Sequence, residues 1–193
     1  MSQALILVDI QNDYFPGGTM ELVGMDAAAN NAYAVLEAFR THGEPIVHIQ
    51  HLAAKPDATF FVPGTAGAEH NEVVAPTGTE SVIQKNFPNS FRGTALENEL
   101  RDHGVEELVI VGAMSHMCID ATTRAAFDLG FKCTVVEDAC ATRDLVFKDK
   151  TVKAEDVHSS FMAALSAPYA TVESTEVFLF LKNADDTLHA PSE

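Results

Sequence analysis

The chain has 193 residues, 47% of them hydrophobic and 21% charged, which is typical of one globular domain with a substantial core. Its formal net charge of −16 argues against nucleic acid or an anionic membrane as a partner. No apolar run approaches the roughly 20 residues of a membrane helix, and the first residues lack the features of a signal peptide. Three cysteines without metal-type spacing argue against a disulfide framework and indicate a reducing compartment, the cytoplasm.

Apolar segments of strand length alternate with segments of helical periodicity along the chain. The expected strands are residues 4–8, 46–50, 81–84, 108–111, 132–136 and 170–173. The expected helices are residues 26–42, 94–103, 118–129 and 154–165, the first capped by Asp26 and the second opened by a capping box at Thr94. This alternation predicts an α/β fold, a three-layer α-β-α sandwich around a Rossmann-like, doubly wound, mostly parallel sheet of about six strands.

The domain is expected to cover residues 1–182 and to be followed by a tail at 183–193. The apolar run at 177–181 needs a packing partner, which the sequence does not identify. Residues 52–79 form a long loop rich in proline and glycine. A loop of this length in a compact domain is usually functional, so we expect it to contribute to a site, a lid or an oligomer contact.

Three chemically useful residues follow predicted strands. Asp9 follows the first strand, Lys85 follows the third and Cys118 follows the fourth. In a doubly wound sheet of order 3-2-1-4-5, ligands bind outside the carboxyl ends of the strands, near the point where the strand order reverses. Strand three lies about 10 Å from strand one, within reach of a lysine side chain. The sequence therefore predicts that an acid, a base and a thiol meet in one crevice.

Cys118 is expected at the start of a helix, directly after a buried strand. Free backbone N–H groups and the helix dipole at such a position stabilise a thiolate and can bind the oxyanion of an acyl intermediate. A carboxylate such as Asp9 can accept the thiol proton and return it to a leaving amine. A cation such as Lys85 is needed to hold the carboxylate beside the sulfur. Alone, Cys118 would be explained equally well as a small buried apolar residue.

These residues resemble the isochorismatase-like cysteine hydrolases, a family that includes nicotinamidases, N-carbamoylsarcosine amidohydrolase and ureidoacrylate amidohydrolases. The resemblance lies in the run from Asp9 to Asp13, in Lys85 and in the segment 112–126 around Cys118, and it spans roughly residues 4–176. It implies an Asp9–Lys85–Cys118 triad without a cofactor and a cis peptide between Ala113 and Met114. It also implies an oxyanion hole formed by the backbone N–H groups of Met114 and Cys118, and a homo-oligomer, a dimer or a tetramer.

The chain departs from the nicotinamidase pattern at the metal site. No Asp lies two residues before His51, and His48 and His51 are three residues apart in a strand and point to opposite faces, so we expect no metal. Weaker candidates for the substrate pocket are Gln11, Phe15, Phe61 and His116, which loop or core roles explain equally well.

Cys118 favours hydrolysis of a small amide, ureido or carbamoyl C–N bond through a thioester. Two alternatives remain open: an isochorismatase-type vinyl ether hydrolase, which needs no cysteine, and a non-enzymatic oligomeric binding protein on the same fold. The partner in the first two cases is a small-molecule substrate, whose identity the sequence does not give.

Overall fold

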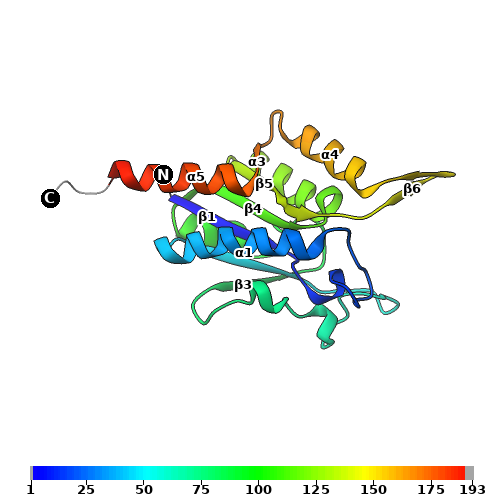
Figure 1. The fold of residues 1–193 in the computed structure, drawn as a ribbon. Coiled ribbons are helices and arrows are strands. Elements are labelled where there is room, and N and C mark those ends of the chain that lie inside the picture. Colours follow the sequence, from blue (N-terminus) through cyan, green and yellow to red (C-terminus); the bar gives the residue numbers. More distant parts are fainter. Residues whose placement is uncertain (1, 190–193) are drawn as a thin grey trace.

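The computed structural model describes residues 2–189, with side chains through residue 184. Its centre is a six-stranded sheet in the order β3-β2-β1-β4-β5-β8, in which all neighbouring strands are parallel (Figure 1). The strands are β1 (Ser2–Val8), β2 (Ile46–His51), β3 (Ser81–Lys85), β4 (Val105–Ala113), β5 (Lys132–Ala141) and β8 (Thr171–Glu173). The predicted strand order and sheet type are confirmed.

Helices cover both faces of the sheet, so the predicted three-layer sandwich is confirmed as well (Figure 1). Helices α1 and α5 pack on one face, and α2, α3 and α4 pack on the other. Their bounds are α1 (Met25–His42), α2 (Leu96–Asp102), α3 (Asp120–Asp128), α4 (Ala154–Leu165) and α5 (Thr175–His189). No described helix is both long enough and apolar enough to span a bilayer.

The central strands are apolar without interruption because both of their faces are covered. In β1, Leu5 and Leu7 belong to the core beneath α1, whereas Ile6 and Val8 belong to the core on the opposite face. All four side chains are at most 2% exposed. A strand buried on two sides needs this continuous pattern, which is the signal that predicted a parallel sheet.

The backbone is unusual where β1 and β4 end. Asp9 directly follows β1 with a φ of 53°, a left-handed conformation that few non-glycine residues adopt and that aspartate tolerates better than most. Beside it, Gly112 has a φ of 121°, and a Cβ at this position would lie 2.0 Å from the carbonyl oxygen of Val8. Only glycine therefore allows β4 to approach β1 this closely at the edge of the sheet where Asp9 lies.

Helix starts differ from the sequence expectations. The N-cap residue of helix α1 is Gly24, which has no side chain to accept a capping hydrogen bond. Asp26, the expected cap, lies in the first turn instead. Helix α2 begins at Leu96, and the Thr94 hydroxyl accepts only a long bond, 3.4 Å, from the Leu96 N–H. Both helices are nonetheless present, because packing of an apolar face contributes more than a cap.

Two features of the C-terminal third were not predicted. An antiparallel hairpin, β6 (Leu145–Phe147) and β7 (Lys150–Val152), lies outside the main sheet. The apolar run at 177–181 lies in α5, where the ring of Phe178 stacks on Phe39 of α1 at 6.3 Å between ring centroids. This contact identifies the partner that the run needed. Helix α5 also includes the first part of the expected tail, and residues 190–193 lie outside the described residues.

Candidate active site

Three strand ends bring Asp9, Lys85 and Cys118 to one edge of the sheet. Asp9 follows β1, Lys85 is the last residue of β3, and Cys118 lies in the short π-helical turn η4 (Ser115–Ile119) between β4 and α3. Strand β2 lies between β1 and β3, and its last residue, His51, reaches the same place. Because the strands are parallel, all four residues lie at the carboxyl edge, where ligands bind in sheets of this kind.

Asp9 and Lys85 form a buried ion pair. The Lys85 Nζ donates to Asp9 Oδ2 at 2.7 Å, and both side chains are 0% exposed. The same ammonium group donates to the carbonyl oxygens of Phe87 and Pro88 at 3.2 and 3.3 Å and lies 3.3 Å from His51 Nδ1. Lys85 is therefore held by several acceptors, which limits the desolvation cost of burying its charge.

The electrostatics of the pair keep both members charged. Burial alone would raise the pKa of Asp9, but the positive charge of Lys85 and the neighbouring ring of His51, whose Nδ1 lies 3.8 Å from Asp9 Oδ2, outweigh it, so this pKa lies below its usual value. Burial alone would lower the pKa of Lys85, but Asp9 more than compensates and the pKa is raised. The other carboxylate oxygen, Asp9 Oδ1, is buried and has no hydrogen-bond partner among the described residues. Asp9 thus retains a free acceptor.

Cys118 lies against this pair. Its side chain is 3% exposed, and its Sγ, a carboxylate oxygen of Asp9 and a ring nitrogen of His51 all lie within 4.8 Å of one another. Burial and then the charge of Asp9 raise the pKa of the thiol, and Lys85 opposes that rise only in part. This shift is opposite to the one expected at a helix start, because burial and the neighbouring carboxylate both disfavour the thiolate.

The backbone around Cys118 offers two N–H groups. The peptide bond between Ala113 and Met114 is cis, at the position that the resemblance implies. The Met114 carbonyl accepts from the N–H groups of Met117 and Ile119. Among the backbone hydrogen bonds of residues 2–189 that lie outside helices and strands, neither Met114 nor Cys118 is a donor. An oxyanion hole requires N–H groups of this kind that a ligand oxygen can reach.

His51 and Tyr14 are the members of this neighbourhood that the sequence analysis missed as site residues. His51 was considered only as a metal ligand, although its position at the end of β2 places it on the same edge as the other three residues. Tyr14 is 2% exposed, and its pKa is raised well above its usual value by burial first and then by the charges of Cys118 and Asp9. Its ring packs on Phe61 at 4.6 Å between centroids. A loop tyrosine carries no sequence signal that would place it there.

The Asp9–His51–Cys118 cluster has the spacing of a metal site but holds an internal cation instead. The Lys85 ammonium faces both Asp9 Oδ2 and His51 Nδ1, and a divalent ion would repel it and compete for the same lone pairs. The residues therefore fit the ammonium group better than a metal. His48 lies elsewhere, with its Nε2 2.9 Å from Glu80 Oε2, so His48 and His51 share no site.

Of the four weaker pocket candidates, Phe61 lines a cavity near the cluster. A pocket of about 480 Å³, which we call the outer pocket, is lined mainly by apolar side chains, among them Phe60, Phe61 and Phe87, and it shares His51 with the Asp9–His51–Cys118 cluster. The Phe61 N–H donates to Asp13 Oδ2 at 2.6 Å, which fixes this part of the long loop.

The other three candidates have different surroundings. Gln11 is fully buried, and its amide binds the backbone of His51 and Ala68, so it braces the site rather than offering a free group to a ligand. Phe15 belongs to the hydrophobic core. His116 is half-buried, with its Nδ1 2.6 Å from the Thr142 hydroxyl.

The chain matches a family model, known protein sequences and solved structures. Residues 3–177 match the family model of the isochorismatase domain. The isochorismatase family protein YddQ of Bacillus subtilis is 53% identical over 179 residues, which cover 93% of this chain and 99% of that protein. The crystal structure of an isochorismatase from Pseudomonas putida is 38% identical, with a TM-score of 0.85, and the match covers 91% of this chain and 89% of that one.

A third match concerns an amidase. The crystal structure of N-carbamoylsarcosine amidase from Thermoplasma acidophilum has a TM-score of 0.79 and is 25% identical to this chain. The match covers 91% of this chain and 98% of the amidase. The similarity therefore extends over most of both chains.

Proposed function

The chain belongs to the isochorismatase family of hydrolases, and from this premise we propose that it hydrolyses a small amide, ureido or carbamoyl C–N bond through a thioester on Cys118. The observation that carries the proposal is the contact of Cys118 with the buried Asp9–Lys85 pair. A vinyl ether hydrolase of the same family needs no thiol, so this arrangement favours the C–N bond. The similarity to an amidase supports the same choice.

The first half of the proposed reaction forms the thioester. The substrate carbonyl lies beside Cys118 with its oxygen toward the N–H groups of Met114 and Cys118. As the sulfur attacks the carbonyl carbon, the thiol proton passes to Asp9, whose Oδ1 is free to accept it. Because the pKa of the thiol is raised, proton transfer and attack occur together, and no thiolate accumulates beforehand. The two N–H groups stabilise the negative oxygen of the tetrahedral intermediate.

The second half releases both products. The C–N bond breaks as Asp9 returns the proton to the leaving nitrogen, so ammonia or an amine departs and the acyl group remains on sulfur. Water then attacks the thioester with Asp9 as the base, the C–S bond breaks, and the proton returns to the sulfur. Lys85 keeps its proton throughout, orients Asp9 and offsets the negative charge that moves between the carboxylate and the substrate.

The surroundings of the cluster suggest the class of substrate. His51 lies beside Cys118 and also lines the outer pocket, where its ring centroid is 5.8 Å from that of Phe61, so we expect the substituent of the substrate to point toward this apolar, partly aromatic wall. We therefore expect a small uncharged or weakly polar amide rather than a polyanion, which the net charge of −16 would repel. The three free cysteines fit a protein of the cytoplasm.

The test is an ammonia-release screen over small amides, ureas and carbamoyl compounds, run with the unmodified protein, Cys118→Ala and Cys133→Ala. Cys133 is a matched control, because it is also a free, buried cysteine, and burial raises the pKa of its thiol to about 12. We expect hydrolysis to be lost only in Cys118→Ala, and an acyl adduct on Cys118 to be trapped by rapid acid quench and detected by mass spectrometry.

Two results would contradict this assignment. Undiminished amide hydrolysis in Cys118→Ala would exclude the thioester. Release of pyruvate from isochorismate that survives alkylation of the thiols would instead support the ether hydrolase.

A further inference from the structure

The turn that carries Cys118 depends on contacts from outside it. Within η4, the N–H groups of Met117 and Ile119 both donate to one acceptor, the Met114 carbonyl, at 2.9 and 3.2 Å. Two bonds that share one carbonyl do not form the regular ladder of an α-helix, in which each N–H has its own acceptor. The position of the turn, and with it of the N–H groups of Met114 and Cys118, therefore has to be fixed by neighbouring elements.

Ser115, the first residue of η4, makes two such contacts. Its side chain is fully buried, and its hydroxyl donates at 3.2 Å to the carbonyl of Ala141, the last residue of β5. The same oxygen lies 2.8 Å from Nδ1 of His158 on α4. Strand β5 is still paired with β4 at Ala141, opposite Ala113. The hydroxyl thus ties the turn to a fixed part of the sheet and to a helix packed on it.

Ser115 and His158 each supply one proton to this contact. A serine hydroxyl donates one proton and also accepts, whereas a neutral imidazole carries a proton on only one nitrogen. The bonds of Ser115 to Ala141 and to His158 exist together only when Nδ1 carries a ring proton. The buried hydroxyl then acts as donor and acceptor at once, so removing either partner leaves part of it unsatisfied.

A serine, an imidazole and a carboxylate in this order are also the parts of a serine nucleophile. Nε2 of His158 lies 3.4 Å from Glu137 Oε2, which is longer than an ordinary hydrogen bond. Ser115 has no exposed surface, and its own proton is directed to a carbonyl rather than to the ring. An acyl compound could not reach this oxygen, so the contact holds the turn and does not supply a second nucleophile.

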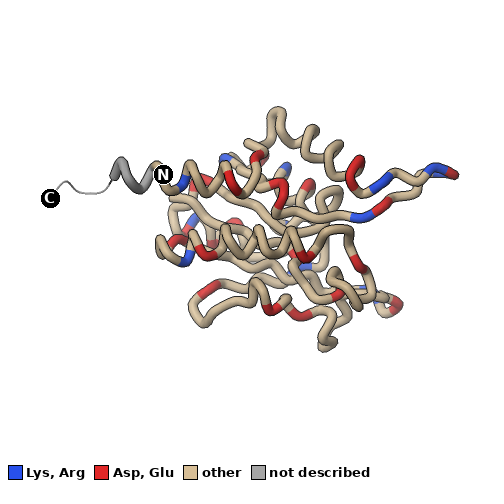
Figure 2. Tube along the Cα trace, in the orientation of Figure 1, with Lys and Arg blue, Asp and Glu red and all other residues tan. Residues whose placement is uncertain are grey.

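His158 reaches the turn from a side that is separate from the outer pocket. It lines a pocket of about 190 Å³ together with Glu137, Asp138 and Glu155, and the two pockets share no residue. Figure 2 shows the acidic positions at the start of α4, among them Glu155. The carboxylates around this smaller pocket repel an anionic ligand. The ring is thus left to hold Ser115.

We propose that Ser115 and His158 are positioning residues for the backbone donors of the oxyanion hole. The proposal rests on the thioester chemistry proposed above, because that chemistry gives the N–H groups of Met114 and Cys118 their task. Ser115 directly follows Met114, so anchoring its side chain fixes the Met114 peptide group. A donor displaced by about 1 Å can lower a rate about 100-fold. Because the substrate oxygen becomes negative only as the sulfur attacks, the loss falls on kcat and not on KM.

The first test compares steady-state kinetics of four variants on the best substrate from the ammonia screen. Ser115→Ala removes the hydroxyl and His158→Leu removes the ring donor, so kcat should fall about 10- to 100-fold in each while KM stays within about threefold. His158→Asn should restore kcat to within about threefold of the wild type. Its amide nitrogen is as many bonds from the backbone as Nδ1 and can still donate to Ser115.

Thr123→Val is the matched control. Thr123 is also fully buried and lies near Cys118 in sequence, but its hydroxyl has no hydrogen-bond partner among the described residues. Its kcat should stay within about twofold of the wild type. An unchanged kcat in Ser115→Ala, an equal loss in the control, or a His158→Asn variant no better than His158→Leu would overturn the proposal.

The second test needs no substrate. Amide hydrogen exchange of Met117 and Ile119 reports opening of the turn, since both N–H groups bond the Met114 carbonyl. Exchange should accelerate at least about tenfold in the two variants that break the contact and in neither His158→Asn nor the control. Faster exchange in a chain that hydrolyses no amide would support the anchor and refute the proposed function alone. Unchanged exchange in a chain whose hydrolysis depends on Cys118 would refute the anchor alone.

Discussion

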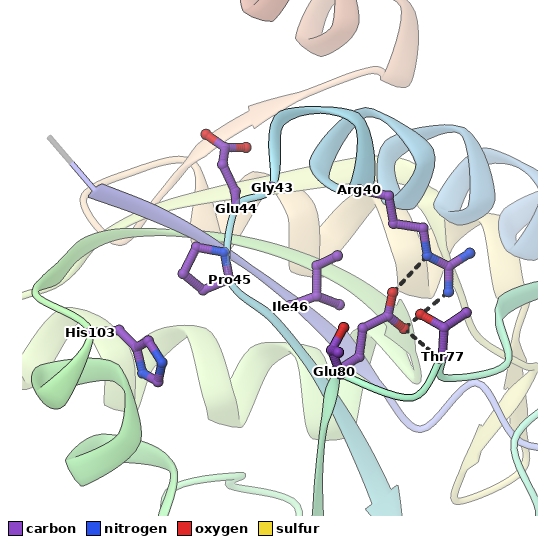
Figure 3. Close-up of a pocket in the computed structure, with 9 residues that line it drawn as sticks. Arg40, Gly43, Glu44, Pro45, Ile46, Thr77, Glu80 and His103 are labelled. Atoms are coloured by element: carbon purple, nitrogen blue, oxygen red, sulfur yellow. Dashed lines mark hydrogen bonds and ion pairs between the residues drawn. The ribbon is translucent and has the colours of Figure 1, made fainter.

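Two ion pairs lie at opposite ends of the parallel strands, and their carboxylate groups differ in how many hydrogen bonds they accept. At the carboxyl edge, Asp9 bonds Lys85 through one oxygen and leaves the other without a partner among the described residues. At the amino edge, Glu80 accepts from two nitrogens of Arg40, from the Thr77 N–H and, at Oε2, meets His48 Nε2. Figure 3 shows this second pair beside a pocket of about 550 Å³, lined by residues that precede β2, β3 and β4.

The two pairs have different expected roles, which are catalysis for Asp9–Lys85 and stability for Arg40–Glu80. Both carboxylates have a lowered pKa, that of Glu80 falling to about 2, so the direction of the shift does not distinguish them. The two carboxylates differ in whether an oxygen without a hydrogen-bond partner lies beside a cysteine thiol. Asp9 has an oxygen without a hydrogen-bond partner among the described residues, next to a thiol, whereas both oxygens of Glu80 are engaged by Arg40, Thr77 and His48. Substitutions in the two pairs should therefore affect different properties.

The largest effect is expected from Asp9→Asn. The amide keeps the shape of the side chain but cannot take the thiol proton, so kcat/KM should fall by about 1000-fold or more. The measurement is steady-state hydrolysis of the best substrate from the ammonia screen, with circular dichroism to show that the fold persists. If the variant keeps a tenth of the activity, Asp9 is not the base.

The next largest effect is expected from Lys85→Met. Without the cation, burial dominates at Asp9 and raises its pKa, because Lys85 is the main group that lowers it. Activity requires the carboxylate, so the acid limb of the profile of kcat/KM against pH should move to higher pH. At neutral pH the activity should fall by about 100-fold. A variant with reduced activity and an unmoved acid limb would limit Lys85 to a packing role.

The Glu80→Gln variant should change stability and leave catalysis alone. It removes the charge that binds Arg40, and the free energy of unfolding should fall by about 1–3 kcal/mol. Urea titration measures that loss, and kcat/KM should stay within about twofold of the wild type because the amino edge lies away from the cluster. A loss of activity as large as that of Lys85→Met would erase the distinction between the two pairs.

The smallest effect concerns acid unfolding. A carboxyl whose pKa is lowered on folding stabilises the protein above its unfolded pKa, and that contribution disappears as the pH falls through the folded value. For Glu80 this window runs from 4.5 down to about 2, and the wild type should lose roughly 1 kcal/mol more than Glu80→Gln across it. Equal acid sensitivity of the two proteins would show that the ion pair does not contribute in this way.

The sequence predicts the parallel sheet and the meeting of its strand ends because both follow from local pattern. Continuous apolar strands require cover on both faces, and the topological rule for such sheets then places Asp9, Lys85 and Cys118 at one edge. In the structure, the Lys85 ammonium group donates a hydrogen bond to Asp9, and the Cys118 sulfur lies within 4.8 Å of a carboxylate oxygen of Asp9. Their catalytic roles remain a prediction.

Features that depend on tertiary environment were harder to predict. The pKa of Cys118 depends on burial and on the charge of Asp9, whereas the sequence showed only a helix start that favours the thiolate. The hairpin of β6 and β7 follows β5 as two three-residue strands, which are too short to carry a periodic signal. Residues 177–181 showed their apolar character but not their partner, because Phe39 lies far away in the sequence.

The position of Lys85 on the outermost strand has a consequence for how this protein loses activity. Strand β3 pairs on one side only, with β2, and edge strands detach in local fluctuations more readily than central ones. When β3 separates, the ammonium group leaves Asp9 while β1 and β4 stay in place. Amide exchange in β3 should therefore be faster than in β1, and mild denaturant should inactivate the protein before the molecule as a whole unfolds.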